Sequence, residues 1–163
     1  MAGQENELAN QQFAQFLLQM DPALVDQKVY TLNNEIAPKI DCTVCGNCCK
    51  TLLININEKE ADALSEHLDQ SRELFDKNYL EKGMNGALLI SAVPCHFLKE
   101  NKCTVYNYRF EGCKEFPAMH LPHFNKRLFT TFMHYNRCPI IYNIVEHLKI
   151  ETQFVLAPKS ETL

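Results

Sequence analysis

Apolar and polar positions in the first forty residues recur with the period of amphipathic helices. The segment from about 7 to 20 carries a broad apolar face, made of Leu8, Phe13, Phe16, Leu17 and Met20. Asp21 and Pro22 then predict an N-cap and the start of a second helix. Its apolar stripe comprises Val25, Val29, Leu32 and Ile36. We expect both faces to pack on the protein's own core; the alternative is an arm that binds a partner.

The middle of the chain predicts short strands between short helices. Residues 52–57 alternate apolar and polar positions, as a half-buried strand does. Asn57 and Glu60 have the spacing of a capping box, which predicts a helix start at this point. A further short helix is expected over 71–82, where two glycines follow it.

The rest of the chain predicts another strand, a hairpin and one long helix. Residues 87–92 form a short apolar run, and 96–98 with 103–106 flank a polar turn, as in a β-hairpin whose turn is not of the Asn-Gly type. The stretch 128–133 fits either a strand or a helix. Cys138-Pro139 predicts a helix that buries Ile140, Ile141, Ile144, Val145 and Leu148. The tail, 151–163, is expected to be loose.

These elements predict a mainly helical α+β protein. We expect a small single domain of about five helices with a short β-hairpin, organised around a cysteine-ligated metal centre. A chain of 163 residues can bury such a core. Residues 1–40 are expected to pack on the domain as an N-terminal helical segment, residues 41–150 to form a cysteine-cluster metal-binding domain, and residues 151–163 to form the C-terminal tail.

Composition narrows the class of protein. The chain is 46% hydrophobic and 22% charged, as folded globular proteins are, and its net charge is −4. It has no basic stripe interleaved with aromatic residues, so nucleic-acid binding is not expected. Its first residues lack the pattern of a signal peptide, and the longest apolar stretch, 87–93, is too short to span a bilayer. We therefore expect a cytoplasmic protein without membrane contact, whose thiols stay reduced.

Eight cysteines carry the candidate chemistry. They begin with the pattern C-x-x-C-x-x-C-C, whose two-residue spacers let the chain wrap around a metal and direct successive sulfurs inward. In a reducing compartment such thiols are expected to bind metal; disulfides are the alternative. The candidate ligands are Cys42, Cys45, Cys48, Cys49, Cys95, Cys103, Cys113 and Cys138.

The cysteine spacing leaves both zinc and iron open. C-x-x-C pairs serve tetrahedral zinc sites. A C-x-x-C-x-x-C run with a remote Cys-Pro, here Cys138-Pro139, is typical of iron–sulfur proteins and slightly favours that cofactor. Because neighbouring side chains point in different directions, Cys48 and Cys49 are expected to serve two adjacent centres or one polynuclear centre. A single centre with four structural or buried thiols is the alternative.

Other polar residues are weaker candidates. Among the cations near the cysteines, Arg109 and Arg137 are the ones most expected to favour thiolate over thiol. His120 and His123 have the look of a ligand pair, but with so many cysteines available we expect them to lie on a packed loop instead.

Three blocks of the sequence resemble the YkgJ-type cysteine-cluster family, which is defined by CxxCxxCC and described as zinc- or iron-chelating. They are Cys42 to Cys49, Pro94 to Leu98 with Cys103 to Tyr106, and Arg109 to Pro117. Phe110 and Lys114 stand where the family often has proline and arginine, and neither change touches a sulfur. The resemblance implies metal chelation by the cysteines. A related module accompanies flagellin lysine N-methylases, whose catalytic barrel this chain is expected to be too short to contain.

Three functions fit these observations. The first is a metal- or cluster-binding module, the second an iron–sulfur-dependent redox or methyl-transfer enzyme or its accessory subunit, and the third a zinc-stabilised adaptor that binds a partner through residues 1–40. The sequence has no nucleotide-binding glycine loop, no Gly-x-Ser-x-Gly elbow and no His-Glu-x-x-His helix. We therefore rank the module first, with metal ions as its ligand and no protein partner identified.

Overall fold

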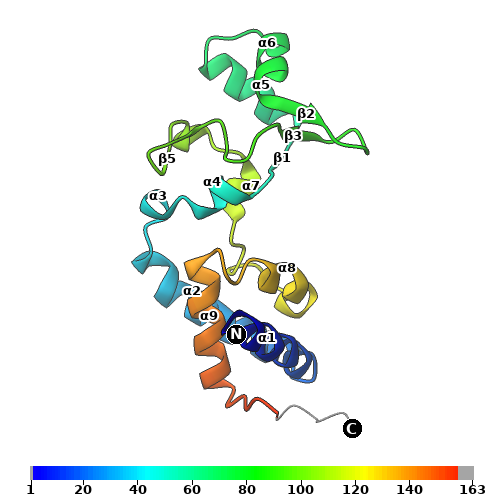
Figure 1. Cartoon of the computed structure of the whole chain (residues 1–163), viewed down its shortest axis with the longest axis vertical. Coiled ribbons are helices and arrows are strands. Elements are labelled where there is room, and N and C mark those ends of the chain that lie inside the picture. Colours follow the sequence, from blue (N-terminus) through cyan, green and yellow to red (C-terminus); the bar gives the residue numbers. More distant parts are fainter. Residues whose placement is uncertain (1, 158–163) are drawn as a thin grey trace. The chain divides into compact units, whose positions relative to one another are not determined.

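The computed structural model describes residues 2–157, which form two compact units (Figure 1). Residues 1–40 together with 117–163 make up one unit, which we call the helical unit. Residues 41–116 make up the other, which we call the cysteine unit. The predicted division into residues 1–40, 41–150 and 151–163 concerns functional segments and stays a prediction.

Two long helices, α2 (Pro22–Ile36) and α9 (Pro139–Glu151), pack on each other in the helical unit. The predicted apolar stripe of α2 is buried, and so are the five predicted apolar positions of α9. Oδ1 of Asp21 caps α2 by accepting from the backbone N–H of Ala23 at 2.8 Å. The unit also contains α1 (Ala2–Leu18), η1 (Ala37–Lys39), η3 (Phe124–Arg127) and α8 (Leu128–Met133). The expectation that this stripe packs on the protein's own core is confirmed.

An aromatic cluster joins α1 to the end of the described chain. The ring of Phe13, which is fully buried, lies 6.3 Å from that of Phe132 and 5.0 Å from that of Phe154, measured between centroids. The backbone N–H of Ala157 also donates to Oε1 of Gln12 at 2.9 Å. The expected loose tail is therefore wrong over residues 152–157, because Phe154 anchors it. The rest of the predicted tail, 158–163, lies outside the described residues.

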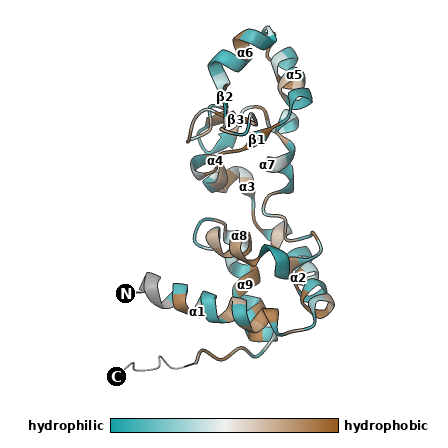
Figure 2. Cartoon of the chain, turned by 90° about the vertical axis from the view of Figure 1, so that its right-hand side faces the viewer, coloured by the Kyte–Doolittle hydropathy of each residue, from teal (hydrophilic) through white to brown (hydrophobic). Residues whose placement is uncertain are grey.

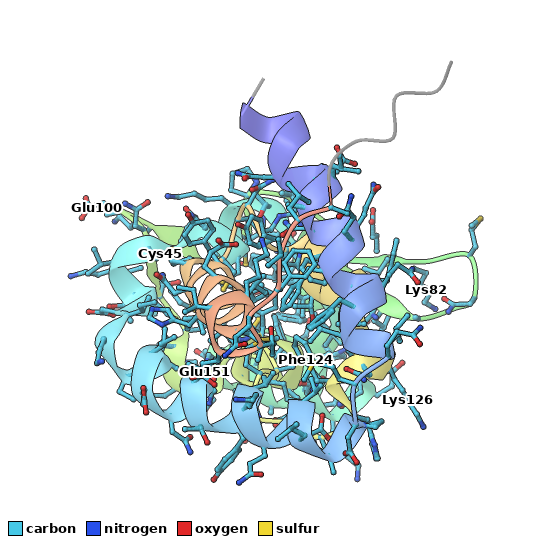
Figure 3. All side chains as sticks on the ribbon, turned by 90° about the horizontal axis from the view of Figure 1, so that it is seen from below. Cys45, Lys82, Glu100, Phe124, Lys126 and Glu151 are labelled. Carbon is cyan, nitrogen blue, oxygen red and sulfur yellow. The ribbon has the colours of Figure 1, made fainter. Side chains whose placement is uncertain are left out.

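The stretch 128–133, which the sequence left open between strand and helix, is the helix α8. Just before it, Phe124 lies inside the helical unit and Lys126 points outward (Figure 3). Hydrophobic residues dominate α9, whereas α5 and α6 of the other unit carry more hydrophilic ones (Figure 2). Within residues 2–157, no helix combines the length and the apolarity that a bilayer crossing requires.

Short helices and two small antiparallel sheets make up the cysteine unit. One sheet has the order β1-β3-β2, formed by β1 (Asn55–Ile56), β2 (Leu80–Lys82) and β3 (Leu88–Ile90). The other is the predicted hairpin, formed by β4 (Leu98–Lys99) and β5 (Lys102–Cys103). The helical elements are α3 (Cys42–Cys45), α4 (Asn47–Thr51), α5 (Glu58–His67), α6 (Arg72–Tyr79), η2 (Tyr106–Tyr108) and α7 (Glu111–Glu115).

The predicted fold class, a small and mainly helical α+β protein with a β-hairpin, is confirmed. Among the described residues, the five helices with eight or more residues are α1, α2, α5, α6 and α9. The helix predicted over 71–82 is wrong at its end. It stops at Tyr79 because residues 80–82 pair with β3 as a strand.

A hydrophobic cluster forms the core of the cysteine unit. Its buried members are Ile56, Ala61, Leu64, Phe75, Leu88, Ile90, Phe97, Val105 and Phe110. The predicted capping box of Asn57 and Glu60 opens α5. The second carboxylate oxygen of Glu60 accepts from the backbone N–H of Glu111 at 2.6 Å, which ties α5 to the start of α7. The Glu60 carboxylate therefore caps α5 and also holds the start of α7, the helix that carries Cys113.

Candidate metal centre

The first four cysteines lie on α3 and α4, which a single glycine separates. Asp41 caps α3, its Oδ1 accepting from the backbone N–H of Thr43 at 2.8 Å and from the Thr43 hydroxyl at 2.7 Å. These hydrogen bonds, with a smaller contribution from the charge of Lys102, lower the pKa of Asp41. Gly46 ends α3 and begins α4 in the left-handed conformation, with φ +60°. The C-x-x-C-x-x-C-C run therefore consists of two short helices joined by one left-handed glycine.

The turn of the hairpin packs against Gly46. A Cβ at Gly46 would lie 2.9 Å from the backbone oxygen of Asn101, so only glycine fits there. Glu100 and Asn101 form a two-residue turn with φ +51° and +65°, the conformation that matches the twist of a tight hairpin. Glu100 points outward from this turn (Figure 3). α3 also contacts β5, which brings the strand of Cys103 to the first cysteines.

Backbone hydrogen bonds and core contacts position the remaining cysteines of the unit. The backbone N–H of Cys95 donates to the carbonyl oxygen of Cys49 at 2.8 Å. Cys95, Cys103 and Cys113 all pack against the hydrophobic cluster of the unit. The elements that carry cysteines lie at the end of the unit away from α6 (Figures 1 and 2). Cys42 is exposed, and the other six cysteines of the unit are half-buried.

The sulfurs interact electrostatically. Sγ of Cys48 and Sγ of Cys49 lie 3.9 Å apart, and the hydrogen bond from the Cys49 thiol lowers the pKa of Cys48 to about 6. The same hydrogen bond, burial and the neighbouring sulfurs raise the pKa of Cys49. Burial, reinforced by negative charge on Cys95, Cys48 and Cys103, raises the pKa of Cys113 to about 12. The negative charge of one thiolate therefore opposes loss of the proton from the neighbouring thiols. A bound cation offsets this repulsion.

We expect zinc binding to release protons and to weaken as the pH falls. The pKa values of Cys42, Cys49, Cys95 and Cys113 are raised, so the metal-free protein carries protons on these thiols at pH 7. A metal binds thiolates and must displace those protons. The apparent affinity should fall by roughly tenfold per pH unit for each proton released. Calorimetric zinc titrations in buffers of different ionisation enthalpy count these protons. Zinc uptake without proton release contradicts thiolate ligation, and magnesium, which prefers oxygen ligands, is the control.

Two cations lie among the cysteines. The Arg109 guanidinium stacks 3.9 Å above the Tyr106 ring, donates to the Tyr106 carbonyl at 2.9 Å, and its charge acts on both Cys42 and Cys113 to lower their pKa values. Nζ of Lys50 donates to the Cys45 carbonyl at 3.3 Å. The expected role of Arg109 near the thiols agrees with this geometry. The sequence analysis did not select Lys50 among the cations near the cysteines. Its position directly after Cys49 could have indicated that it lies in the cluster.

Other predicted residues lie in the helical unit. Cys138 is buried there as the N-cap of α9, and Arg137 approaches Nδ1 of His134 at 3.2 Å. His120 and His123 are exposed on a loop of the same unit. The seven other cysteines all belong to the cysteine unit.

The donor chemistry fits a soft metal ion. Within residues 2–157, no three His, Cys, Asp or Glu side chains are placed as ligands of one ion. Three of the thiols, Cys95, Cys103 and Cys113, nevertheless pack against one core from separate segments, and thiolate sulfur is the donor that suits zinc and iron–sulfur centres. The arrangement is that of a metal-binding cysteine-cluster protein.

A comparison with known protein families agrees with a metal-binding role. The family CxxCxxCC, described as "Putative zinc- or iron-chelating domain", matches residues 41–139, which is more than half of the chain. The chain belongs to this family, and the predicted resemblance is confirmed. No curated protein and no solved structure matches the chain. Metal chelation is therefore its function in general terms.

Proposed function

We propose that thiolates of the predicted cysteines hold zinc or iron, with the seven thiols of the cysteine unit as the principal donors. The observation that carries the proposal is the proximity of these thiols. Cys95, Cys103 and Cys113 pack against one hydrophobic core, and the backbone N–H of Cys95 donates to the carbonyl of Cys49, whose Sγ lies 3.9 Å from that of Cys48. The helix α3, which carries the first two cysteines, contacts the strand β5 of Cys103. One tetrahedral ion uses only four of the seven thiols, which supports two adjacent centres.

Cys138 is the predicted ligand with the least support. It is 7% exposed in the helical unit, apart in sequence from the blocks that carry the other thiols. The preference for an iron–sulfur cluster depends on Cys138-Pro139 as the remote ligand. A zinc or iron ion bound by the cysteine unit alone does not need Cys138 as a ligand.

Anaerobic purification with metal and sulfide analysis tests the proposal. A colourless protein that carries zinc, or iron without sulfide, supports thiolate-bound ions. A brown protein with stoichiometric iron and sulfide supports clusters instead. Protein that is metal-free under reducing conditions, or whose thiols are paired as disulfides, contradicts chelation by these cysteines.

We expect Cys45→Ser to lose at least one ion per chain and to lower the melting temperature, because metal binding is coupled to folding. His123→Ala is the matched control, since His123 is exposed and lies in the helical unit. Metal analysis and thermal unfolding measure both. Unchanged metal in Cys45→Ser, or halved metal in His123→Ala, contradicts the ligand set.

An iron–sulfur-dependent redox or methyl-transfer enzyme is the second candidate. The exposed Cys42 favours it, because one edge of the site faces solvent and catalytic metals keep an open coordination position. Visible absorption that dithionite bleaches reversibly supports this candidate, and a zinc-only protein excludes it.

A further inference from the structure

We propose that the groove between α1 and α8 is the contact surface of a weak symmetric dimer, in which two copies of this chain lie face to face. The inference goes beyond the proposed function, because none of the residues that line the groove is a cysteine. The groove has a volume of about 540 Å³, and its two walls come mainly from α1 and α8 of the helical unit. These two helices lie next to each other (Figures 1 and 2).

The groove presents an apolar surface to solvent. Phe129 is 81% exposed on its α8 wall, and Met133, one turn later, is 51% exposed. The buried Asn10 also lines the groove, but its Oδ1 already accepts from Nζ of Lys149 at 2.8 Å, and the same ammonium donates to Glu146 at 2.7 Å. The charge of this lysine is therefore engaged inside the unit. Exposed apolar side chains between polar ones are typical of a surface that another protein covers.

The two walls of the groove run antiparallel. At one end, Nδ2 of Asn125 donates to the carbonyl oxygen of Leu17 at 3.0 Å. Further along, the Phe13 ring lies edge-on to that of Phe132, with 6.3 Å between centroids. The chain therefore moves toward the start of α1 as it moves toward the end of α8, so residues near these two termini lie at the same end of the groove.

The two ends of the groove carry opposite charges. Glu7, near the start of α1, lines one end. Lys126 comes just before α8 at the other end, is exposed, and points outward (Figure 3). Among the residues that the structure describes, neither side chain forms an ion pair. A partner that fits this groove must therefore carry a cation at one end and an anion at the other.

A second copy of the same groove meets this condition. A two-fold axis that crosses the groove at its middle, in the plane of the contact, lays the two grooves antiparallel. Glu7 of each copy then faces Lys126 of the other, and the symmetry forms this ion pair twice. Phe129, one turn from Lys126, enters the part of the second groove that Met133 lines, where a flexible thioether side chain adapts to the ring. The surface is thus complementary to itself in both charge and shape.

The size of the groove predicts a weak dimer. Nine residues line it, whereas a stable interface uses roughly 20–30 residues on each side. We therefore expect association at micromolar or higher concentrations and a monomer in dilute solution. In dilute solution Phe129 stays exposed and contributes little to folding.

Sedimentation equilibrium of the reduced full chain over a concentration series tests the proposal. We expect reversible dimerisation, which Phe129→Glu should weaken roughly tenfold or more, because it places a carboxylate in the apolar part of the contact. Ile150→Glu is the matched control. Ile150 is 73% exposed on α9 of the same unit and does not line the groove, so its substitution should leave the dimer unchanged.

Two charge reversals test the antiparallel arrangement itself. Glu7→Lys and Lys126→Glu should each weaken self-association roughly tenfold, because each places like charges at both ends of the contact. An equimolar mixture of the two variants should associate about as well as the unsubstituted chain, since every end again joins opposite charges. This recovery also shows that both variants are folded.

Three results overturn the proposal. They are a chain that stays monomeric up to millimolar concentration, a dimer that Phe129→Glu leaves intact, and a mixture of the charge variants that associates no better than either variant alone. The first result leaves the groove to a partner of another kind. None of them bears on metal chelation, which the metal content of the same samples measures separately.

Discussion

A Gly46→Ala variant is expected to lose roughly 2–3 kcal/mol of folding free energy and to bind metal more weakly. The residue has φ +60°, where a side chain is strained, and the new Cβ would lie 2.9 Å from the Asn101 carbonyl oxygen. Relief of this contact moves the hairpin turn away from the cysteine run and with it the strand of Cys103. Urea unfolding of the metal-free, reduced protein measures the first effect, and a competition titration with a chromophoric zinc chelator measures the second.

Gly86→Ala is the matched control for Gly46→Ala. Gly86 has φ +79°, yet a Cβ there meets nothing within 4 Å. Its substitution should cost about 1 kcal/mol from backbone strain alone and leave metal affinity unchanged. Equal effects of the two variants would show that the contact with Asn101 contributes nothing.

Substitution of one buried phenylalanine in each unit should show how much each unit contributes to stability and to metal binding. Phe75 and Phe13 are both fully buried, the first in the core of the cysteine unit and the second in the helical unit. Each change to alanine should cost about 3–5 kcal/mol through lost burial and the cavity left behind. Only Phe75→Ala should weaken metal binding, because Cys95, Cys103 and Cys113 pack against the cluster that contains Phe75.

Hydrogen exchange resolved along the chain, together with metal titration, measures these effects. Protection should fall within residues 41–116 for Phe75→Ala, and within the two flanking segments for Phe13→Ala. Phe129→Ala is the control, since Phe129 is 81% exposed and its loss should change stability by less than about 0.5 kcal/mol. If Phe13→Ala weakens metal binding as much as Phe75→Ala does, the site depends on the helical unit, as ligation by Cys138 requires.

Helices and caps that depend only on residues close together in the chain could be predicted from the sequence. The α2 stripe and the Asn57–Glu60 capping box are set by nearby residues, and both are present. The strand β2 was missed because residues 80–82 continue a helical pattern and become a strand only by pairing with β3. The anchored Phe154 was missed for a similar reason, since its partner Phe13 lies far away in sequence.

The sequence predicted which residues belong to the candidate site, but it predicted less of their arrangement in space. The C-x-x-C-x-x-C-C run, the Pro94–Leu98 block and the Arg109–Pro117 block pointed to the thiols that the cysteine unit brings together. The spacing did not predict that Cys48 and Cys49 converge to 3.9 Å, because a helical wheel separates neighbours by angle and ignores side-chain rotation. Nor did it predict that Asn101 requires a glycine at position 46.

The order of the two units along the chain has a consequence for biosynthesis. α2 packs against α9, so the helical unit cannot close until the ribosome has translated residues on both sides of the cysteine unit. Residues 41–116 emerge together and contain all the partners of their own core. The cysteine unit can therefore fold on the nascent chain before α9, the helix that packs against α2, has been translated.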